Sequence, residues 1–286
     1  MNRKRLKRGL VIFVAGLLLL CLLAGGSSVI LNGRLPTQSD SIAQLSAADK
    51  GRLAEFFHLQ DTLGDAVWPG FGQADIPIIL YNEEYAFLVG IAEPANGWQT
   101  VPSQDQHGTA WEIVPDDSFA GRPYYRQPLV GEVTPQAFVV RVGDKWAASM
   151  TAMQWMRIEM ANLIRRDLPP GVQTIFPTWL MVGALVDSSD HHIAMVAHES
   201  FHAFQGMMNE AKLAVAETAV AHNQNYPIKD QTFQDAWQNE LDLLAQAVQA
   251  ESEAEAAKLT NQFLAQRLER RQTLSADQIA YEKSRE

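Results

Sequence analysis

A short stretch of the chain, MVAHESFHAFQG at residues 195–206, contains side chains whose types and spacing suit metal chemistry. Within it, His198 and His202 lie four residues apart, and Glu199 directly follows the first histidine. On a helix, residues four apart lie on the same face, so both imidazoles can bind one ion. Neutral imidazole nitrogens are good ligands for Zn²⁺, which undergoes no redox change. The spacing therefore predicts that His198 and His202 bind zinc.

Glu199 projects about 100° around the helix from His198, so its carboxylate can reach a water molecule on the zinc rather than the zinc itself. Zinc lowers the pKa of bound water from about 15.7 toward about 7, and a carboxylate can then take its proton during attack on a carbonyl carbon. The motif therefore predicts a hydrolase with Glu199 as general base. The alternative is an amphipathic helix with two solvent-facing histidines and no metal.

The H-E-x-x-H pattern resembles the zincin metallopeptidases, which carry it on their active-site helix. The resemblance implies zinc bound by the two histidines, with Glu199 as catalytic base. The metzincin branch continues as HExxHxxGxxH, but here Gly206 lies one place late and Asn209 has no imidazole. Peptide deformylases add a cysteine ligand, whereas the single cysteine here is Cys21, in the apolar N-terminal stretch. The gluzincin pattern remains, in which a glutamate from a later helix completes the site.

One glutamate on a later helix stands out by its position. The helix expected after Asp230 has an apolar face formed by Phe233, Trp237, Leu241, Leu244 and Val248. Glu240 falls on the same face, three residues after Trp237 and four before Leu244. A carboxylate directed into a core is unfavourable unless it is paired, hydrogen-bonded or bound to a metal. Glu240 is therefore predicted to be the third zinc ligand, and a buried salt bridge is the alternative.

Two other glutamates are alternative third ligands. Glu282 and Glu286 lie four residues apart on one side of the helix expected at the C-terminal end of the chain. The sequence YEKSRE at residues 281–286 contains no glycine, proline or other helix stop signal. A further possibility is therefore that the chain is truncated and that the ligand lies beyond residue 286.

The secondary structure expected around these residues changes along the chain from strands to helices. A helix is expected from the cap residue Ser46 to about Leu63. Residues 76–148 are rich in alternating and β-branched stretches, which are typical of strands, and residues 150–286 are mostly helical in pattern. Strands followed by helices predict an α+β fold, here with a β-rich half and a zincin-like helical half.

The segments on either side of the motif are also interpretable. Residues 174–186, TIFPTWLMVGALV, are apolar and are expected to form a buried strand interrupted by Pro177. The following residues, 187–190, offer N-cap side chains for the helix that carries HESFH. That helix is expected to continue to about His222.

Composition limits the class of protein and its partners. The 286 residues are 47% hydrophobic and 20% charged, as in an ordinary globular protein, and the formal net charge is −10. Such an acidic chain is a poor partner for nucleic acid. The part after Cys21 has no cysteine, which excludes disulfides and thiolate ligands there. Any metal site in that part must use histidines and carboxylates.

The N-terminal residues suggest targeting to a membrane. MNRKRLKR precedes an uncharged stretch from Gly9 to Leu31. Its length and its basic flank predict a transmembrane signal anchor over residues 1–31, with the N-terminus in the cytoplasm. A linker over 32–45 and one extracytoplasmic domain over 46–286 would follow. Alternatively, signal peptidase cleaves near AGGSS at 24–28 and the protein is secreted.

Together these features predict a membrane-anchored extracytoplasmic zinc hydrolase. The expected reaction is cleavage of a peptide or protein substrate, with Zn²⁺ as cofactor and no nucleic-acid partner; a cell-wall amide is another carbonyl substrate open to the same chemistry. The alternative is a non-catalytic binding or scaffolding domain with a degenerate or structural metal site. Glu199 argues against a structural site, which normally has four protein ligands and no need of a base.

Overall fold

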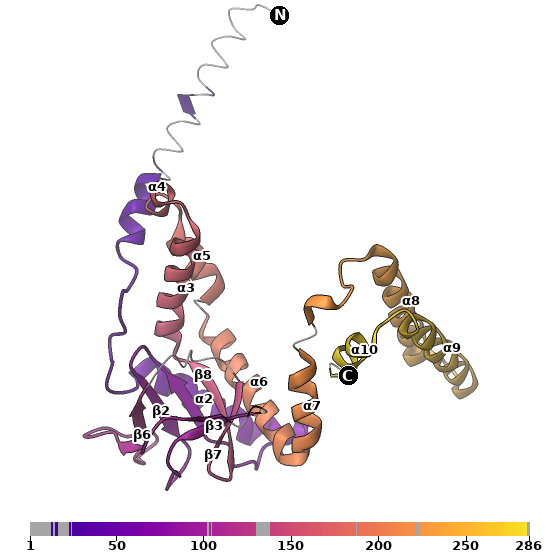
Figure 1. Ribbon diagram of the computed structural model, residues 1–286, viewed down its shortest axis with the longest axis horizontal. Helices are drawn as coiled ribbons and strands as arrows, with labels where there is room; N and C mark the ends of the chain where they lie inside the picture. The colour runs from indigo at the N-terminus through magenta and orange to yellow at the C-terminus, as the bar shows by residue number, and fades with distance from the viewer. Residues whose placement is uncertain are drawn as a thin grey trace, which may run out of the picture. The chain divides into compact units, whose positions relative to one another are not determined.

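The computed structural model describes residues 13, 15–16, 23, 25–101, 103, 105–129, 138–186, 188–220 and 223–284 (Figure 1). The chain divides into two compact units, Met1–Met208 and Asn209–Glu286. The first unit contains the described strands and the helix with HESFH, whereas the second is helical. The expected order of strands first and helices second is therefore found.

The first unit is built on one sheet with the strand order β4-β3-β7-β8-β1-β2-β6-β5. The strands are β1 (Ile78–Tyr81), β2 (Tyr85–Val89), β3 (Trp98–Thr100), β4 (Gln106–His107), β5 (Glu112–Ile113), β6 (Tyr125–Pro128), β7 (Phe138–Val142) and β8 (Lys145–Thr151). Strands β1 and β8 are parallel, and the other neighbouring pairs are antiparallel. The β7–β8 hairpin turns at Gly143 and Asp144, as the sequence predicts.

The two sides of the sheet are packed differently. Because side chains alternate along a strand, Ile78 and Leu80 of β1 point to one side. There they pack with helix α2 (Ala47–Val67) and with Val196 of helix α6 (Ser189–Met208). The residues on the opposite side of the sheet form a second cluster contributed by strands β1, β2, β3, β7 and β8. The HESFH helix thus packs on the side of the sheet that carries Ile78 and Leu80, and against α2.

The remaining helices follow in chain order. The first unit also has α3 (Met153–Asp167), α4 (Pro170–Gln173) and α5 (Thr178–Val186). The second unit contains α7 (Glu210–Val220), the 3-10 turn η1 (Asn223–Asn225), α8 (Gln231–Gln249), α9 (Glu253–Arg271) and α10 (Ala276–Ser284). Helices α8 and α9 pack on each other, and α10 packs on α7.

The expected transmembrane helix over residues 1–31 needs correction. Most of residues 1–24 lie outside the described part of the chain, and residues 25–32 are helical. A membrane-spanning helix needs about 20 apolar residues. No helix among the described residues has the length and hydrophobicity to cross a membrane. The fold class is accordingly α+β, without the predicted N-terminal transmembrane helix as one of its described elements.

The prediction of a buried strand at 174–186 is wrong. This stretch forms helix α5 from Thr178, and Leu180 and Leu185 are 52% and 55% exposed. Pro177 directly precedes the helix, where its fixed φ angle and missing N–H group are tolerated. A continuous apolar run does not distinguish a buried strand from a helix, and here the run belongs to a helix with an exposed side.

The helix that carries HESFH is also shorter than expected. It ends at Met208 rather than near His222, which lies outside the described residues. Helix α7 begins at Glu210, and the side chain of Asn209 accepts a hydrogen bond from the backbone N–H of Lys212 (3.0 Å). An asparagine side chain used in this way caps a new helix, so Asn209 separates α6 from α7.

Candidate metal centre

Helix α6 is oriented by its buried side. Its start is capped as predicted, because Ser188 Oγ accepts a hydrogen bond from the backbone N–H of His191 (3.2 Å). Val196, Ser200 and Ala203 are buried, and the Ser200 hydroxyl donates to the carbonyl of Val196 (2.8 Å). Side chains two residues from Ser200 point about 200° away from it on a helix. The rotation of α6 therefore directs both motif histidines away from the sheet.

A close approach to the sheet fixes the C-terminal end of the same helix. A Cβ atom at Gly206 would lie 2.5 Å from Cζ3 of Trp146 on strand β8. Real Cβ atoms do not come so close to a ring carbon, so a glycine is needed where the helix backbone meets the indole. Gly206 therefore has a packing role, rather than the turn role that a metzincin glycine would have.

The two motif histidines lie close together at their Nε2 atoms. The Nε2 atoms of His198 and His202 are 3.0 Å apart, and their rings are nearly perpendicular at 86°. Two imidazoles bound to tetrahedral zinc at about 2.05 Å place their nitrogens about 3.3 Å apart. The observed separation is within a few tenths of an ångström of that value. The separation of the two nitrogens is therefore close to that of two zinc ligands, and His198 is exposed to solvent.

Gln205 orients one of these imidazoles, a role that the sequence reasoning missed. Its Oε1 atom lies 2.8 Å from Nδ1 of His202. An amide oxygen can only accept, so the Nδ1 atom of His202 carries the proton and its Nε2 lone pair faces His198. Such a second partner for a metal-binding histidine is usual in metal sites. The i, i+3 spacing from His202 was the signal that could have identified Gln205.

Glu199 is half-buried on α6, beside the exposed His198. No group of three or more histidine, cysteine, aspartate or glutamate side chains suited to a metal occurs within the described residues. The structure thus brings His198 and His202 together on one helix face. The role of Glu199 as a base stays a prediction.

An aromatic cluster lies next to the histidines. Phe201 of α6 contacts Phe71 (ring centroids 5.3 Å apart) and Trp68 (6.1 Å), both from the turn after α2. The carboxylate of Asp65 holds this turn by accepting hydrogen bonds from the backbone N–H groups of Gly70 (3.1 Å) and Gly72 (2.9 Å). Phe71 is buried, whereas Trp68 is 53% exposed. The turn therefore fills the core and also presents an indole on the surface.

The histidines at the start of α6 have different environments. His191 is exposed. His192 is buried, and its Nε2 atom lies 2.9 Å from the carbonyl oxygen of Thr151. Burial lowers the pKa of His192, although the hydrogen bond to Thr151 opposes the shift. His192 is thus a neutral core residue, whereas His191 is a solvent-facing neighbour of the motif.

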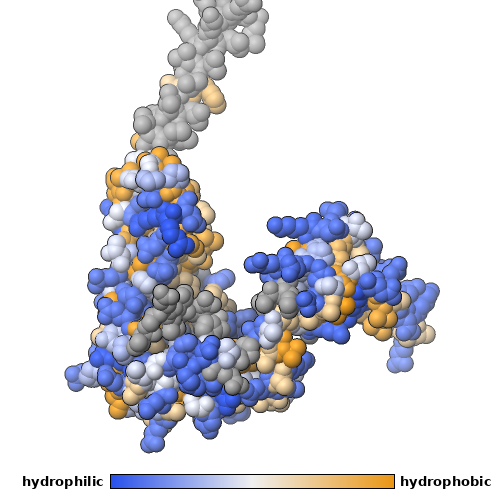
Figure 2. Space-filling model, viewed as in Figure 1, coloured by the Kyte–Doolittle hydropathy of each residue, from blue (hydrophilic) through white to orange (hydrophobic). Residues whose placement is uncertain are grey.

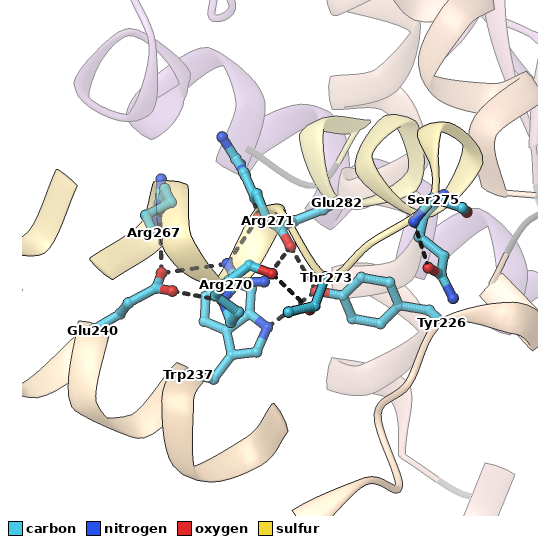
Figure 3. A network of polar contacts seen from close by, with 10 residues as sticks. Tyr226, Trp237, Glu240, Arg267, Arg270, Arg271, Thr273, Ser275 and Glu282 are labelled. Atoms are coloured by element: carbon cyan, nitrogen blue, oxygen red, sulfur yellow. Dashed lines mark hydrogen bonds and ion pairs between the residues drawn. The ribbon is translucent and has the colours of Figure 1, made fainter. Parts of the chain in front are cut away.

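Glu240 belongs to the second unit and is fully buried in an ion-pair network (Figure 3). Its Oε1 accepts a hydrogen bond from Nε of Arg270 (2.5 Å), and its Oε2 accepts one from Nε of Arg267 (3.3 Å). The guanidinium of Arg270 also lies over the ring of Trp237, 4.2 Å from its centroid. Of the two alternatives for Glu240, the structure describes the buried salt bridge. As a zinc ligand, Glu240 stays an untested prediction.

Glu282 joins the same network. The guanidinium of Arg270 donates to both of its oxygens (2.6 and 2.9 Å), and Arg271 and Tyr226 donate to it as well (2.6 and 2.8 Å). Burial opposes ionisation of Glu282, but these hydrogen bonds outweigh it and lower its pKa to about 2. Glu282 is therefore an ionised carboxylate held by arginines. Glu286, the other candidate, lies outside the described residues.

No family model, curated protein or solved structure matches this chain significantly. The resemblance to zincins therefore rests on the HESFH residues themselves. What the geometry adds is the close approach of the two Nε2 atoms and the hydrogen bond that orients one of the imidazoles.

Proposed function

We propose that the protein is a zinc-dependent hydrolase, with His198 and His202 as zinc ligands and Glu199 as general base. The observation that carries the proposal is the 3.0 Å separation of the two Nε2 atoms. The orientation of His202 by Gln205 supports it, because the Nε2 lone pair of His202 then points toward the imidazole of His198.

Each residue has a distinct task in this proposal. When bound, zinc polarises a substrate carbonyl and makes water acidic enough to give up a proton near neutral pH. The two imidazoles hold the ion in their neutral form, which is the form that has a lone pair for a metal. Glu199 takes the proton and later delivers it to the leaving group. Glu199 needs no direct contact with the ion for this task.

A peptide is the substrate that fits best. Phe201 directly precedes His202, and the exposed indole of Trp68 contacts it. Apolar and aromatic side chains beside a hydrolytic centre provide a surface for an apolar substrate side chain. We therefore propose peptidase activity, with an apolar residue of the substrate lying next to Trp68.

The experiment compares four full-length proteins in the presence of zinc, with a library of internally quenched peptides. The parent is expected to cleave at least one peptide, and Glu199→Gln is expected to bind zinc with cleavage reduced by at least about 100-fold. The His198→Ala protein should lose both zinc binding and peptide cleavage. His191→Ala changes an exposed histidine on the same helix and should retain both. Zinc binding without cleavage of any peptide by the parent would contradict the peptidase proposal.

One observation favours a non-catalytic domain as the second candidate. The His198–His202 hydrogen bond and the His202–Gln205 hydrogen bond satisfy the imidazole nitrogens of His202 without a metal. In that case the helix serves only as packing, and His198→Ala would change neither zinc content nor any activity of the parent.

A further inference from the structure

The longest uncharged stretch after the N-terminal segment lies in helices α4 and α5. Residues 168–186, LPPGVQTIFPTWLMVGALV, contain no charged side chain, although 20% of the whole chain is charged. Helix α5 buries Thr178, Val182 and Val186, and it packs on α3. The apolar residues on its other side therefore have no place in this packing.

These residues form an exposed apolar surface, which we call the α4–α5 face. It consists of Val172 (38% exposed), Ile175 (53%), Leu180 (52%), Met181 (39%) and Leu185 (55%). Figure 2 shows hydrophobic residues gathered around α4. Single exposed apolar residues are common on proteins, but five of them within the uncharged residues 172–185 indicate an interaction surface.

Hydrogen bonds of Asn32 connect the α4–α5 face to the end of the N-terminal segment. This side chain is 7% exposed and donates hydrogen bonds to the carbonyl oxygens of Thr174 (3.1 Å) and Phe176 (2.7 Å). Its Oδ1 atom accepts a hydrogen bond from the backbone N–H of Trp179 (3.0 Å). Residues 25–32, which are helical, therefore end beside α4 and the start of α5 (Figure 1).

The apolar surface continues onto this adjoining helical segment. Val29 and Ile30 are 43% and 62% exposed there. In the sequence, every residue from Gly9 to Leu31 is uncharged. Arg34 follows this segment in the sequence, and Arg166 precedes Leu168 and pairs with Asp167 (3.9 Å); all three side chains are exposed. Cationic side chains at the ends of an apolar segment suit a lipid headgroup region, where cations meet phosphates and apolar side chains meet acyl chains.

We propose that the α4–α5 face lies on a lipid bilayer, with Leu180, Met181 and Leu185 inserted at the boundary between headgroups and acyl chains. Lipid is the proposed occupant because Asn32 connects this uncharged face to the end of the uncharged stretch Gly9–Leu31, whose composition suits the apolar interior of a bilayer. The driving force is burial of apolar surface, which does not require an anionic membrane and is compatible with the net charge of −10. The proposal is independent of zinc and of catalysis.

The test places an environment-sensitive fluorophore on the face in the full-length chain. Cys21→Ser removes the native thiol, and Leu185→Cys provides one labelling position on α5. The matched control, Asp144→Cys, places the same label in the β7–β8 turn, which is exposed on the same unit. Both proteins are reconstituted with phosphatidylcholine vesicles, with and without nitroxide groups on the acyl chains.

The label at 185 is expected to be quenched by about half by the nitroxide lipids and to be protected from aqueous iodide, whereas the label at 144 should behave in the opposite way. A companion protein carries the label at Ile175→Cys together with the change Leu180→Glu. It should show weaker lipid quenching than the same labelled protein in which Leu180 is retained. Val215→Glu, at an exposed apolar position of α7, should leave that quenching unchanged. Equal iodide access at 185 and 144 in vesicles would overturn the proposal. So would protection of 185 that needs no lipid and rises with protein concentration, which would indicate a second copy of the chain.

Discussion

The two units each contain a cluster of ionisable side chains on helices, but the clusters satisfy their polar atoms in opposite ways. In the first unit, His198 is exposed and His202 is half-buried, and the two hydrogen-bond to each other. In the second unit, Glu240 and Glu282 are buried, and arginines occupy their oxygens. The two imidazole Nε2 atoms lie at a separation compatible with a shared zinc ion, whereas the carboxylates are already bound by guanidinium groups.

The difference has a simple electrostatic origin. A buried carboxylate is destabilised by several kcal/mol unless a cation is paired with it, so removal of its arginine is unfavourable. Burial by itself would lower the pKa of Arg270, but its hydrogen bonds to Glu282 and Glu240 raise the pKa above its usual value. Metal capture by Glu240 would have to replace that interaction. The histidines are not buried in such a network of ion pairs, and they are partly solvated.

The largest expected effect comes from removing the central cation of the buried network. Arg270→Met should lower the free energy of unfolding of the second unit by about 3–5 kcal/mol, because two buried carboxylates lose their main partner. Thermal melting and hydrogen exchange of peptides from 209–286 measure the loss. Zinc binding at α6 should be unchanged.

A compensated variant sharpens this prediction. Replacing Arg270 by Met together with Glu240→Leu and Glu282→Leu removes all the buried charge and should restore most of the lost stability. A triple variant as unstable as Arg270→Met would show that the network contributes through something other than its charges.

The pH dependence of stability should also reside in the second unit. The pKa of Glu282 is lowered from 4.5 to about 2 in the folded protein. A lowered folded pKa stabilises the fold above pH ~4.5, and this stabilisation of about 3 kcal/mol is lost as the pH falls toward ~2. Chemical denaturation at several pH values measures it. In Glu282→Gln, the unfolding free energy should vary less over that pH range, and an identical pH profile in both proteins would contradict the assignment.

The smallest expected effect concerns the orientation of His202. Gln205→Ala removes the acceptor for Nδ1–H and should weaken zinc binding by about 10-fold, within the usual range for partners of metal-binding histidines. Gln205→Glu keeps an acceptor at the same place and should preserve the affinity. Competition with a zinc chelator measures both proteins. Equal zinc affinity in Gln205→Ala and the parent would remove Gln205 from the site.

Local signals in the sequence were sufficient for much of the fold. Ser46 was readable as a helix cap and Asp230 as the start of a later helix, and each side chain accepts a hydrogen bond from the first turn of its helix. Each of these hydrogen bonds joins residues three apart in the sequence, so tertiary contacts rarely prevent it. The HESFH helix was likewise predictable from its spacing and its upstream cap.

The features that the sequence did not reveal depend on distant partners. Glu240 reads as a carboxylate on an apolar helix face, but its cation, Arg270, lies thirty residues later on α9. The three arginines near the end of α9 were visible, yet only the packing of α8 on α9 shows that they reach Glu240. Similarly, the apolar sequence of residues 174–186 does not indicate whether another element covers the outer side of the helix.

The central claim is that the histidine pair on α6, and not a buried carboxylate, holds the metal. Zinc content per chain tests this claim most directly. Three folded full-length proteins are equilibrated with zinc, desalted and analysed for the element. The account predicts about one zinc in the parent and in Glu240→Gln, and almost none in His198→Ala. Equal zinc in His198→Ala and the parent, or loss of zinc in a folded Glu240→Gln, would contradict it.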